Sequence, residues 1–207
     1  MNPFDQIEEE TKFLRIEGHG IDVTYEEGFL TLEEASSYFD RVYAEADWHR
    51  PQMTFGDGVV RETRRQVAWH ADEGLTYEYS GQRHKWVGWT PSMLELREKL
   101  QTKMGIDFNG VLLNHYADGS DYVSAHSDDE RDMEEGIPIV CLSLGAMRDF
   151  VFKHRELKTR HVLVLKSGSL VSMAGDTQKV ATHTIPKRAA VVDPRISLTF
   201  RRAIRRG

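Results

Sequence analysis

The sequence predicts a mainly β protein with flanking helices, in the α+β class, whose strands form an antiparallel sandwich or jelly roll. Three observations support this class. Two apolar stripes at helical spacing lie in the first half of the 207-residue chain. About eight short segments rich in β-forming residues follow from residue 111 onward. Turn signals such as Asp118-Gly119 and Asp193-Pro194 separate these segments.

The two helices are predicted by their end signals as well as by their stripes. The run Thr31-Leu32-Glu33-Glu34 has the pattern of a capping box, and apolar residues then recur at helical spacing. A helix is therefore expected over about residues 32–46. Thr90-Pro91 is typical of an N-cap followed by proline at the first helical position. A second helix is expected from there to Gly105, a typical C-terminal signal.

The strands are predicted from short runs of β-branched, aromatic and aliphatic residues between turn signals. The expected strands are residues 111–116, 122–127, 138–144, 149–153, 161–165, 169–173, 189–192 and 195–201. The two helices would pack on one of the resulting sheets. A barrel of this kind can hold one small site in its mouth.

The composition fits a globular protein of one domain, since 40% of the residues are hydrophobic and 29% are charged. No apolar run approaches the length of a membrane span, and the N-terminus lacks the features of a secretory signal. The single cysteine, Cys141, excludes an internal disulfide and is expected to be a buried core residue. We expect an intracellular monomer, in the cytoplasm, nucleoid or nucleus, with no membrane partner.

The charge is unevenly distributed along the chain. The net charge is −6, but residues 1–50 carry 4 basic and 13 acidic residues, whereas residues 151–207 carry 13 basic and 3 acidic residues. The acidic average therefore does not exclude a nucleic-acid partner, because a local basic face sets phosphate binding. The alternative is that the acidic N-terminal part covers the basic C-terminal part.

Two His-x-Asp patterns are candidates for a metal site. Residues two apart share a face of a strand, so His126 and Asp128 could bind one ion. With a second histidine, His183, they would form the set of two histidines and one carboxylate that binds divalent iron. A polar strand edge without metal is the alternative. We interpret the second pattern, His70-Ala71-Asp72, as a chance match at the end of a strand.

Polar residues alternate with apolar ones in two further segments. Residues 195, 197, 199 and 201 share one face of a predicted strand, with three apolar residues on the other face. Asn114 and Tyr116 share a face in the same way. These faces could meet water, as in many antiparallel sheets, or they could line a common cavity. The alternation alone leaves both interpretations open.

Several longer motifs follow one another in a specific order. They are Asn114-His115-Tyr116-Ala117-Asp118-Gly119, His126-Ser127-Asp128-Asp129-Glu130, the run 143–152, His183-Thr184-Ile185-Pro186 and the run 195–201. In this order, over residues 51–202, they resemble the AlkB family of oxidative nucleic-acid demethylases. The run Thr54-Phe55-Gly56 and residues 74–81 look like the branch of that family that repairs alkylated DNA. The resemblance implies one dioxygenase domain over residues 1–207, in which residues 1–50 are an acidic extension with one helix.

The resemblance also implies a fold, a cofactor and a co-substrate. The fold would be a double-stranded β-helix, the jelly roll of this family, holding Fe(II) through His126, Asp128 and His183. Arg195 matches the residue that grips the distal carboxylate of 2-oxoglutarate, where the planar guanidinium offers two parallel hydrogen bonds. Four further residues match positions that complete this pocket: Asn114, Tyr116, Thr199 and Arg201. Ser197 stands where the family usually has asparagine.

The implied reaction is oxidative demethylation of N-alkylated bases in DNA, such as 1-methyladenine and 3-methylcytosine. The reaction would use Fe(II), oxygen and 2-oxoglutarate and release succinate, CO₂ and formaldehyde. RNA or tRNA demethylation by the same chemistry is the first alternative. A β-barrel that binds nucleic acid without catalysis is the second.

The base would have to leave the duplex to reach a buried iron. The resemblance implies seven substrate-binding residues: Phe55, Gly56, Arg64, Tyr77, Tyr79, Asp129 and Glu130. Tyr79 would stack on the flipped base, and Phe55 would fill the gap it leaves. Asp129 and Glu130 would favour a cationic methylated base. Asp57 departs from the pattern, since a basic residue there would help to hold DNA.

Overall fold

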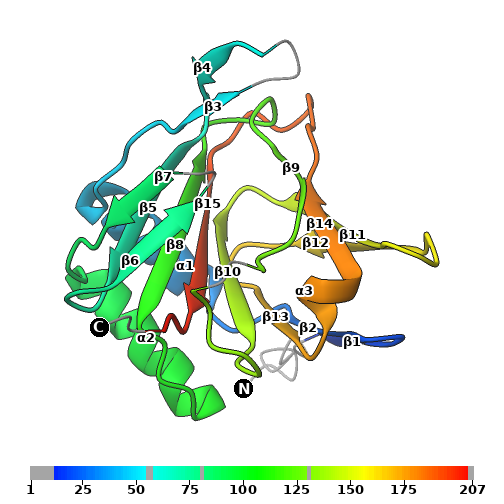
Figure 1. The fold of residues 1–207 in the computed structure, drawn as a ribbon. Helices are drawn as coiled ribbons and strands as arrows, with labels where there is room; N and C mark the ends of the chain where they lie inside the picture. Colours follow the sequence, from blue (N-terminus) through cyan, green and yellow to red (C-terminus); the bar gives the residue numbers. More distant parts are fainter. Residues whose placement is uncertain (1–11, 55–57, 80–81, 130–131, 205–207) are drawn as a thin grey trace, which may run out of the picture.

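The computed structural model describes residues 12–54, 58–79, 82–129 and 132–204. Two antiparallel sheets face each other in it (Figure 1). The larger has the strand order β1 (Phe13–Gly18), β2 (Ile21–Glu26), β13 (Leu170–Ala174), β10 (Ile139–Gly145), β15 (Arg195–Arg201), β8 (Gly110–Tyr116) and β5 (Gln66–Ala71). The smaller has the order β12 (Arg160–Leu165), β11 (Arg148–His154), β14 (Ala181–Ile185) and β9 (Val123–His126). The mainly β fold that the sequence predicts is confirmed.

Side chains from both sheets pack together in part of the space between them. Cys141 and Met173 of the larger sheet belong to one buried cluster with Phe150, Phe152 and Leu165 of the smaller sheet. Cys141 is thus a core residue, as predicted, and is 7% exposed. Such a cluster supplies the main stabilisation of a sandwich, because apolar area leaves water on both sheets.

Both predicted helices cover the outer face of the larger sheet. They are α1 (Leu32–Glu45) and α2 (Pro91–Met104). Buried Val42 of α1 and Leu96 of α2 share a cluster with Leu142 and Leu198 of the sheet. The central strands β10 and β15 are therefore buried on both faces, which explains their nearly continuous apolar sequences. In the described part of the chain, helices fall short of the length and apolarity that crossing a membrane requires.

The ends of these helices follow the local signals in the sequence. The Thr31 hydroxyl accepts a hydrogen bond from the Glu34 backbone, and the Glu34 carboxylate accepts one from the Thr31 backbone, which completes a capping box. Gly105 ends α2 in the left-handed conformation, with φ of 69°. Two short hairpins complete the fold: β3 (Gln52–Thr54) with β4 (Val60–Glu62), which stands apart from the two sheets in Figure 1, and β6 (Thr76–Tyr79) with β7 (Gln82–Lys85).

The N-terminal region is more than an extension with one helix. Besides α1 it contains β1 and β2, and β2 pairs with β13 inside the larger sheet. Ile21, Val23 and Tyr25 alternate with polar residues and are buried in the core between the sheets. This is the period of two expected for a strand with one buried face. The first strands of the jelly roll therefore lie before residue 50.

Two strand predictions need correction. Residues 189–192 do not form a strand, since the chain turns there and its backbone bonds to a neighbouring loop instead, through Gly119 and Val191. The strand predicted at 122–127 ends at His126, so Asp128 lies just beyond it. β14, which carries His183, was not among the predicted strands. A short helix, α3 (Thr177–Val180), leads into it.

Candidate active site

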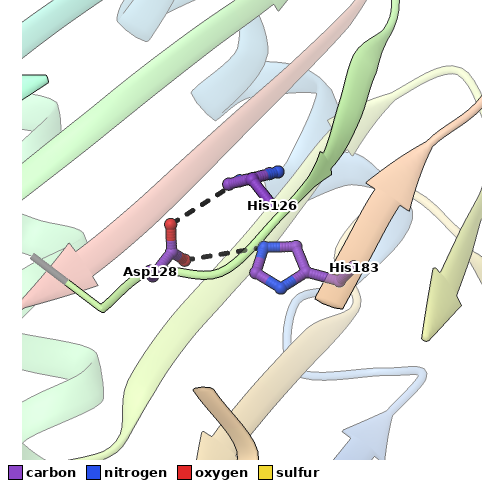
Figure 2. A group of neighbouring side chains, drawn as sticks. All are labelled: His126, Asp128 and His183. Carbon is purple, nitrogen blue, oxygen red and sulfur yellow. Dashed lines mark ion pairs between the residues drawn. The ribbon is translucent and has the colours of Figure 1, made fainter. Parts of the chain in front are cut away.

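His126, Asp128 and His183 come together at the open edge of the smaller sheet. His126 ends β9 and lies directly opposite His183 of β14 in the strand pairing. Figure 2 shows the two imidazole rings and the carboxylate turned toward one another. Each histidine Nε2 lies 3.7 Å from an oxygen of Asp128. The potential ligand atoms of the three residues all lie within 4.8 Å of one another. This donor set fits a divalent iron with open coordination positions.

The protonation states also fit a metal site. Burial lowers the pKa of His183 to about 4, so its imidazole is neutral near pH 7. Burial alone would raise the pKa of Asp128, but electrostatic attraction from neighbouring basic groups, Arg201 foremost, outweighs it and holds that pKa below its ordinary value. Metal binding requires a neutral imidazole and an ionised carboxylate. His126 bonds through Nδ1 to the Ser124 carbonyl oxygen at 2.9 Å, which leaves Nε2 facing the carboxylate.

A cavity of about 500 Å³, part of it open to solvent, joins the triad to β8 and β15. The polar faces of both strands line it, through Asn114 and Tyr116 on β8 and through the four alternating residues 195, 197, 199 and 201 on β15. The three apolar residues between them pack under the helices. The polar faces therefore line a common cavity rather than meeting water.

Arg195 is a buried cation in the wall of this cavity. It is 1% exposed, and its Nη2 donates to the Ser143 hydroxyl at 2.9 Å. Its Nε and Nη1 have no hydrogen-bond partner among the described residues. The Tyr116 ring lies 5.1 Å from the guanidinium. A buried guanidinium with free donors is costly unless an anion binds there, so the cavity fits a ligand with a carboxylate.

The comparisons with known proteins agree with this geometry. The model of the 2OG-Fe(II) oxygenase superfamily matches residues 22–201. The chain belongs to this superfamily. Members use Fe(II) and 2-oxoglutarate, so the protein is a dioxygenase with these two requirements. The match begins in β2, which agrees with the position of this strand inside the larger sheet.

Relatives place this oxygenase in the AlkB family. The DNA oxidative demethylase ALKBH2 of Bos taurus is 35% identical over 213 residues, which cover 92% of this chain and 71% of that protein. The protein of the same name from Arabidopsis thaliana is 33% identical, over 89% of this chain and 67% of that protein. The solved structure of OsALKBH1 has a TM-score of 0.64 at 12% identity and covers 91% of this chain and 100% of that one. This last likeness concerns the fold alone and supports the predicted jelly roll.

The remaining residues predicted to bind the co-substrate all line the cavity. Asn114, Tyr116 and Thr199 are between 2% and 7% exposed. Arg201 is 1% exposed, and its Nη2 donates to Asp128 Oδ1 at 2.7 Å. Arg201 thus holds the carboxylate of the triad from the side of β15. A hydrogen bond of this kind orients a metal ligand.

Sequence reasoning missed two buried arginines, one that lines the cavity and one that contacts a residue lining it. Arg65, which was not among the predicted site residues, is 4% exposed, lines the cavity and donates to Asn114 Oδ1. Arg148 is 2% exposed and lies over the Tyr116 ring, on which Arg195 also lies. Arg148 donates to the backbone oxygens of Asp121 and Pro186, each at 2.7 Å. Isolated arginines in the sequence carry no signal that separates burial from a solvated surface.

The predicted substrate residues are placed less completely. Phe55, Gly56 and Glu130 lie outside the described residues, and for Tyr77 and Tyr79 the structure describes the backbone of β6 alone. Asp129 is exposed directly after the triad carboxylate. The Arg64 side chain is 61% exposed, and its guanidinium contacts Asp118 at 2.9 Å and Asp121 at 3.5 Å.

The second His-x-Asp pattern is structural, as expected. The His70 ring lies between the Asp47 backbone N–H, at 3.3 Å, and the Gly88 carbonyl oxygen, at 2.7 Å. Asp72 accepts hydrogen bonds from Trp89 and Arg97. His70 and Asp72 have the same spacing as His126 and Asp128. Their hydrogen-bond partners show that they contribute to the packing between β5 and α2.

Proposed function

We propose that this oxygenase removes alkyl groups from the nitrogen atoms of DNA bases, with 1-methyladenine and 3-methylcytosine as typical substrates. The main support for this proposal is the similarity to proteins named DNA oxidative demethylase, which extends over 89% to 93% of this chain. The cavity that contains both the triad and Arg195 supplies a site for the chemistry. The superfamily membership leaves no role for the alternative of a non-catalytic barrel.

In this proposal His126, Asp128 and His183 hold Fe(II), and Arg201 orients the carboxylate. Arg195 binds the distal carboxylate of 2-oxoglutarate through its free Nε and Nη1, while Ser143 fixes Nη2. Asn114, Tyr116 and Thr199 complete the pocket. Iron and co-substrate, when bound, would supply the oxidation of the N-methyl group by O₂: one oxygen atom would enter succinate as 2-oxoglutarate loses CO₂, and the other would leave with the methyl carbon as formaldehyde.

The burial of the triad sets the requirement for substrate access. Asp128 and His183 are 4% and 5% exposed, so a base inside a duplex cannot reach them. We assign stacking on the flipped base to Tyr79, with support from Tyr77, and assign the wedge in the vacated stack to Phe55 and Gly56. Stacking of one base on an aromatic ring contributes about 1–3 kcal/mol.

Charge favours a methylated base and holds the strand. Asp129 and Glu130 would attract the cationic ring of 1-methyladenine or 3-methylcytosine. Arg64 would bind a phosphate, exchanging part of its contact with Asp118 for that new anion. We place this enzyme inside the cell with its DNA, and we expect a monomer, because one chain supplies the whole triad and Arg195.

The test is formaldehyde release from oligonucleotides of one sequence that carry 1-methyladenine, prepared as DNA and as RNA. We expect faster release from DNA, and a slower rate for the Tyr79→Ala and Phe55→Ala variants. Faster release from RNA would favour the RNA alternative. Unchanged turnover in both variants would point to a small-molecule or protein substrate and would contradict the proposed base recognition.

A further inference from the structure

The backbone that carries Asp128 is not held by the strand pairing. β9 ends at His126, and the register between β9 and β14 shifts between the pairs made by His183 and Ile185. Asp128 lies two residues beyond the end of its strand, yet its side chain is 3% exposed and aligned with both histidines. Contacts from other elements must therefore fix the position of this residue.

One of these contacts comes from the short helix α3. The backbone N–H of Asp128 donates to Gln178 Oε1 at 2.9 Å. The donor is a backbone N–H, so the side-chain oxygen of Gln178 must be the acceptor. The hydroxyl of the preceding residue, Ser127, donates to the Ala181 carbonyl oxygen at 3.2 Å. The segment 178–181 thus holds both residues that follow His126.

Gln178 is itself held in place at its other end. Its Nε2 contacts Met173 Sδ at 3.3 Å, and Met173 is 2% exposed and lines the cavity. Helix α3 is anchored by the neighbouring Thr177, which is 1% exposed. The Thr177 hydroxyl accepts from the Asp22 backbone N–H at 2.8 Å and donates to the Ala174 carbonyl oxygen at 2.6 Å. Gln178 therefore projects from a base fixed to β2 and β13.

The same segment supplies another member of the triad. His183 lies five residues after Gln178 and follows α3 on β14. A shift of α3 would therefore move His183 directly and Asp128 through the bond to Gln178. The hydrogen bond to Gln178 therefore couples these two residues, whose His183 Nε2 and Asp128 Oδ2 atoms lie 3.7 Å apart.

We propose that Gln178 is a positioning residue for the metal site, acting through the backbone of Asp128. This inference rests on the proposed iron-binding role of the triad. Gln178 stays outside the triad and fixes the peptide that carries the carboxylate, while Arg201 fixes the carboxylate itself. Partners of this kind typically change metal affinity by about 10–100-fold when they are replaced.

The test measures Co(II) binding to the metal-free full chain by calorimetry, without 2-oxoglutarate or DNA. Gln178→Met keeps the length of the side chain and removes the acceptor, so we expect an affinity loss of roughly 10–100-fold. Gln178→Glu keeps an acceptor oxygen at the same reach and should therefore avoid this loss of about 10–100-fold. Lys179→Met is the matched control on the exposed side of α3, and we expect no change.

A steady-state measurement separates positioning from a general loss of structure. For Gln178→Met we expect a higher Fe(II) requirement, with a kcat at saturating iron close to that of the natural protein. Thermal unfolding of the metal-free variants shows whether they fold. Should Gln178→Met unfold, Gln178→Asn carries the same test, because its amide is one methylene too short to reach Asp128.

Two outcomes would overturn the inference: Gln178→Met or Gln178→Asn binding Co(II) as tightly as the natural protein, or Gln178→Glu binding as weakly as Gln178→Met. The His126→Ala variant distinguishes this failure from that of the proposed metal site. If His126→Ala also binds Co(II) normally, the triad assignment itself is wrong. If His126→Ala loses binding while Gln178→Met keeps it, the role of Gln178 alone is refuted.

Discussion

Arg195 is the residue whose environment indicates a bound ligand most clearly. Its two free donors are fixed in a buried wall, and a carboxylate would accept both. We expect Arg195→Lys to raise the KM for 2-oxoglutarate by roughly 10–100-fold, because lysine replaces a planar pair of donors with a single point charge. Steady-state kinetics with varied 2-oxoglutarate measures this, with Arg15→Lys as the control, because the Arg15 side chain is 49% exposed on β1. A KM within twofold of the natural value would show that Arg195 does not bind the co-substrate.

His70 makes the stability of the protein depend on pH. Burial lowers its pKa below the ordinary value of 6.5, because its ring is enclosed between Asp47 and Gly88. Just below pH 6.5, His70 becomes protonated in the unfolded chain, whereas in the folded protein it stays neutral until the pH falls further. The contribution of His70 to the free energy of unfolding is therefore fully present above pH 6.5, and it is lost as the pH falls below 6.5 toward the lowered pKa of the folded protein.

We therefore expect His70→Gln to be less stable than the natural protein at pH 7, but to lose less stability between pH 7 and pH 5. Urea unfolding of both proteins at the two pH values measures this difference. His115 and His183, whose pKa values burial also lowers, are present in both proteins, so their contributions cancel in the comparison. Equal losses in the two proteins would show that folding does not lower the pKa of His70.

The triad could be predicted from the sequence because its residues lie in ordered motifs. The partners that hold them could not. Arg148, Arg65 and Gln178 contact residues between 27 and 50 positions away in the chain, and each contact depends on the assembled fold. A single arginine or glutamine has the same appearance in a sequence whether it is buried in a site or exposed to water.

At the scale of elements, α2 offers a direct test of a local signal. Gly105 ends this helix with φ of 69°, and an added Cβ would meet nothing within 4 Å. The cost of Gly105→Ala therefore comes from the backbone conformation alone, and we expect a loss of about 1 kcal/mol in the free energy of unfolding. Gly88→Ala, also in open space but without positive φ, should change it by less than about 0.5 kcal/mol. Equal effects of the two substitutions in chemical denaturation would contradict this explanation.

The two helices were predictable because their caps and apolar stripes are local. The strands were less so. β14 has the sequence Ala-Thr-His-Thr-Ile, whose polar residues give no clear strand signal. Its pairing with β11 and β9 shows that it is a strand. The run 189–192 has the opposite problem, since its β-forming residues lie in a turn that the contact with Gly119 determines. Tertiary contacts outweigh propensity in both segments.

At the scale of the whole molecule, the first fifty residues support the site. β2 extends the larger sheet, and Asp22 in it bonds to Thr177 at the base of α3.

The fold brings only some of the basic residues of the C-terminal part into contact with acidic residues of the N-terminal part. Lys166 pairs with Glu27, but Lys153 and Arg160 of the smaller sheet stay exposed. The alternative that the acidic region covers the basic one therefore does not hold for these two residues.

The most direct measurement is the yield of succinate and formaldehyde from single-stranded DNA that carries 1-methyladenine, with Fe(II), oxygen and 2-oxoglutarate. We expect the natural protein to release the two products in equal amounts, and Asp128→Ala to release neither, because that variant lacks the carboxylate that both histidines face. Formaldehyde release that persists in Asp128→Ala, or its absence from the natural protein, would contradict the assignment of this cavity as the active site of a DNA demethylase.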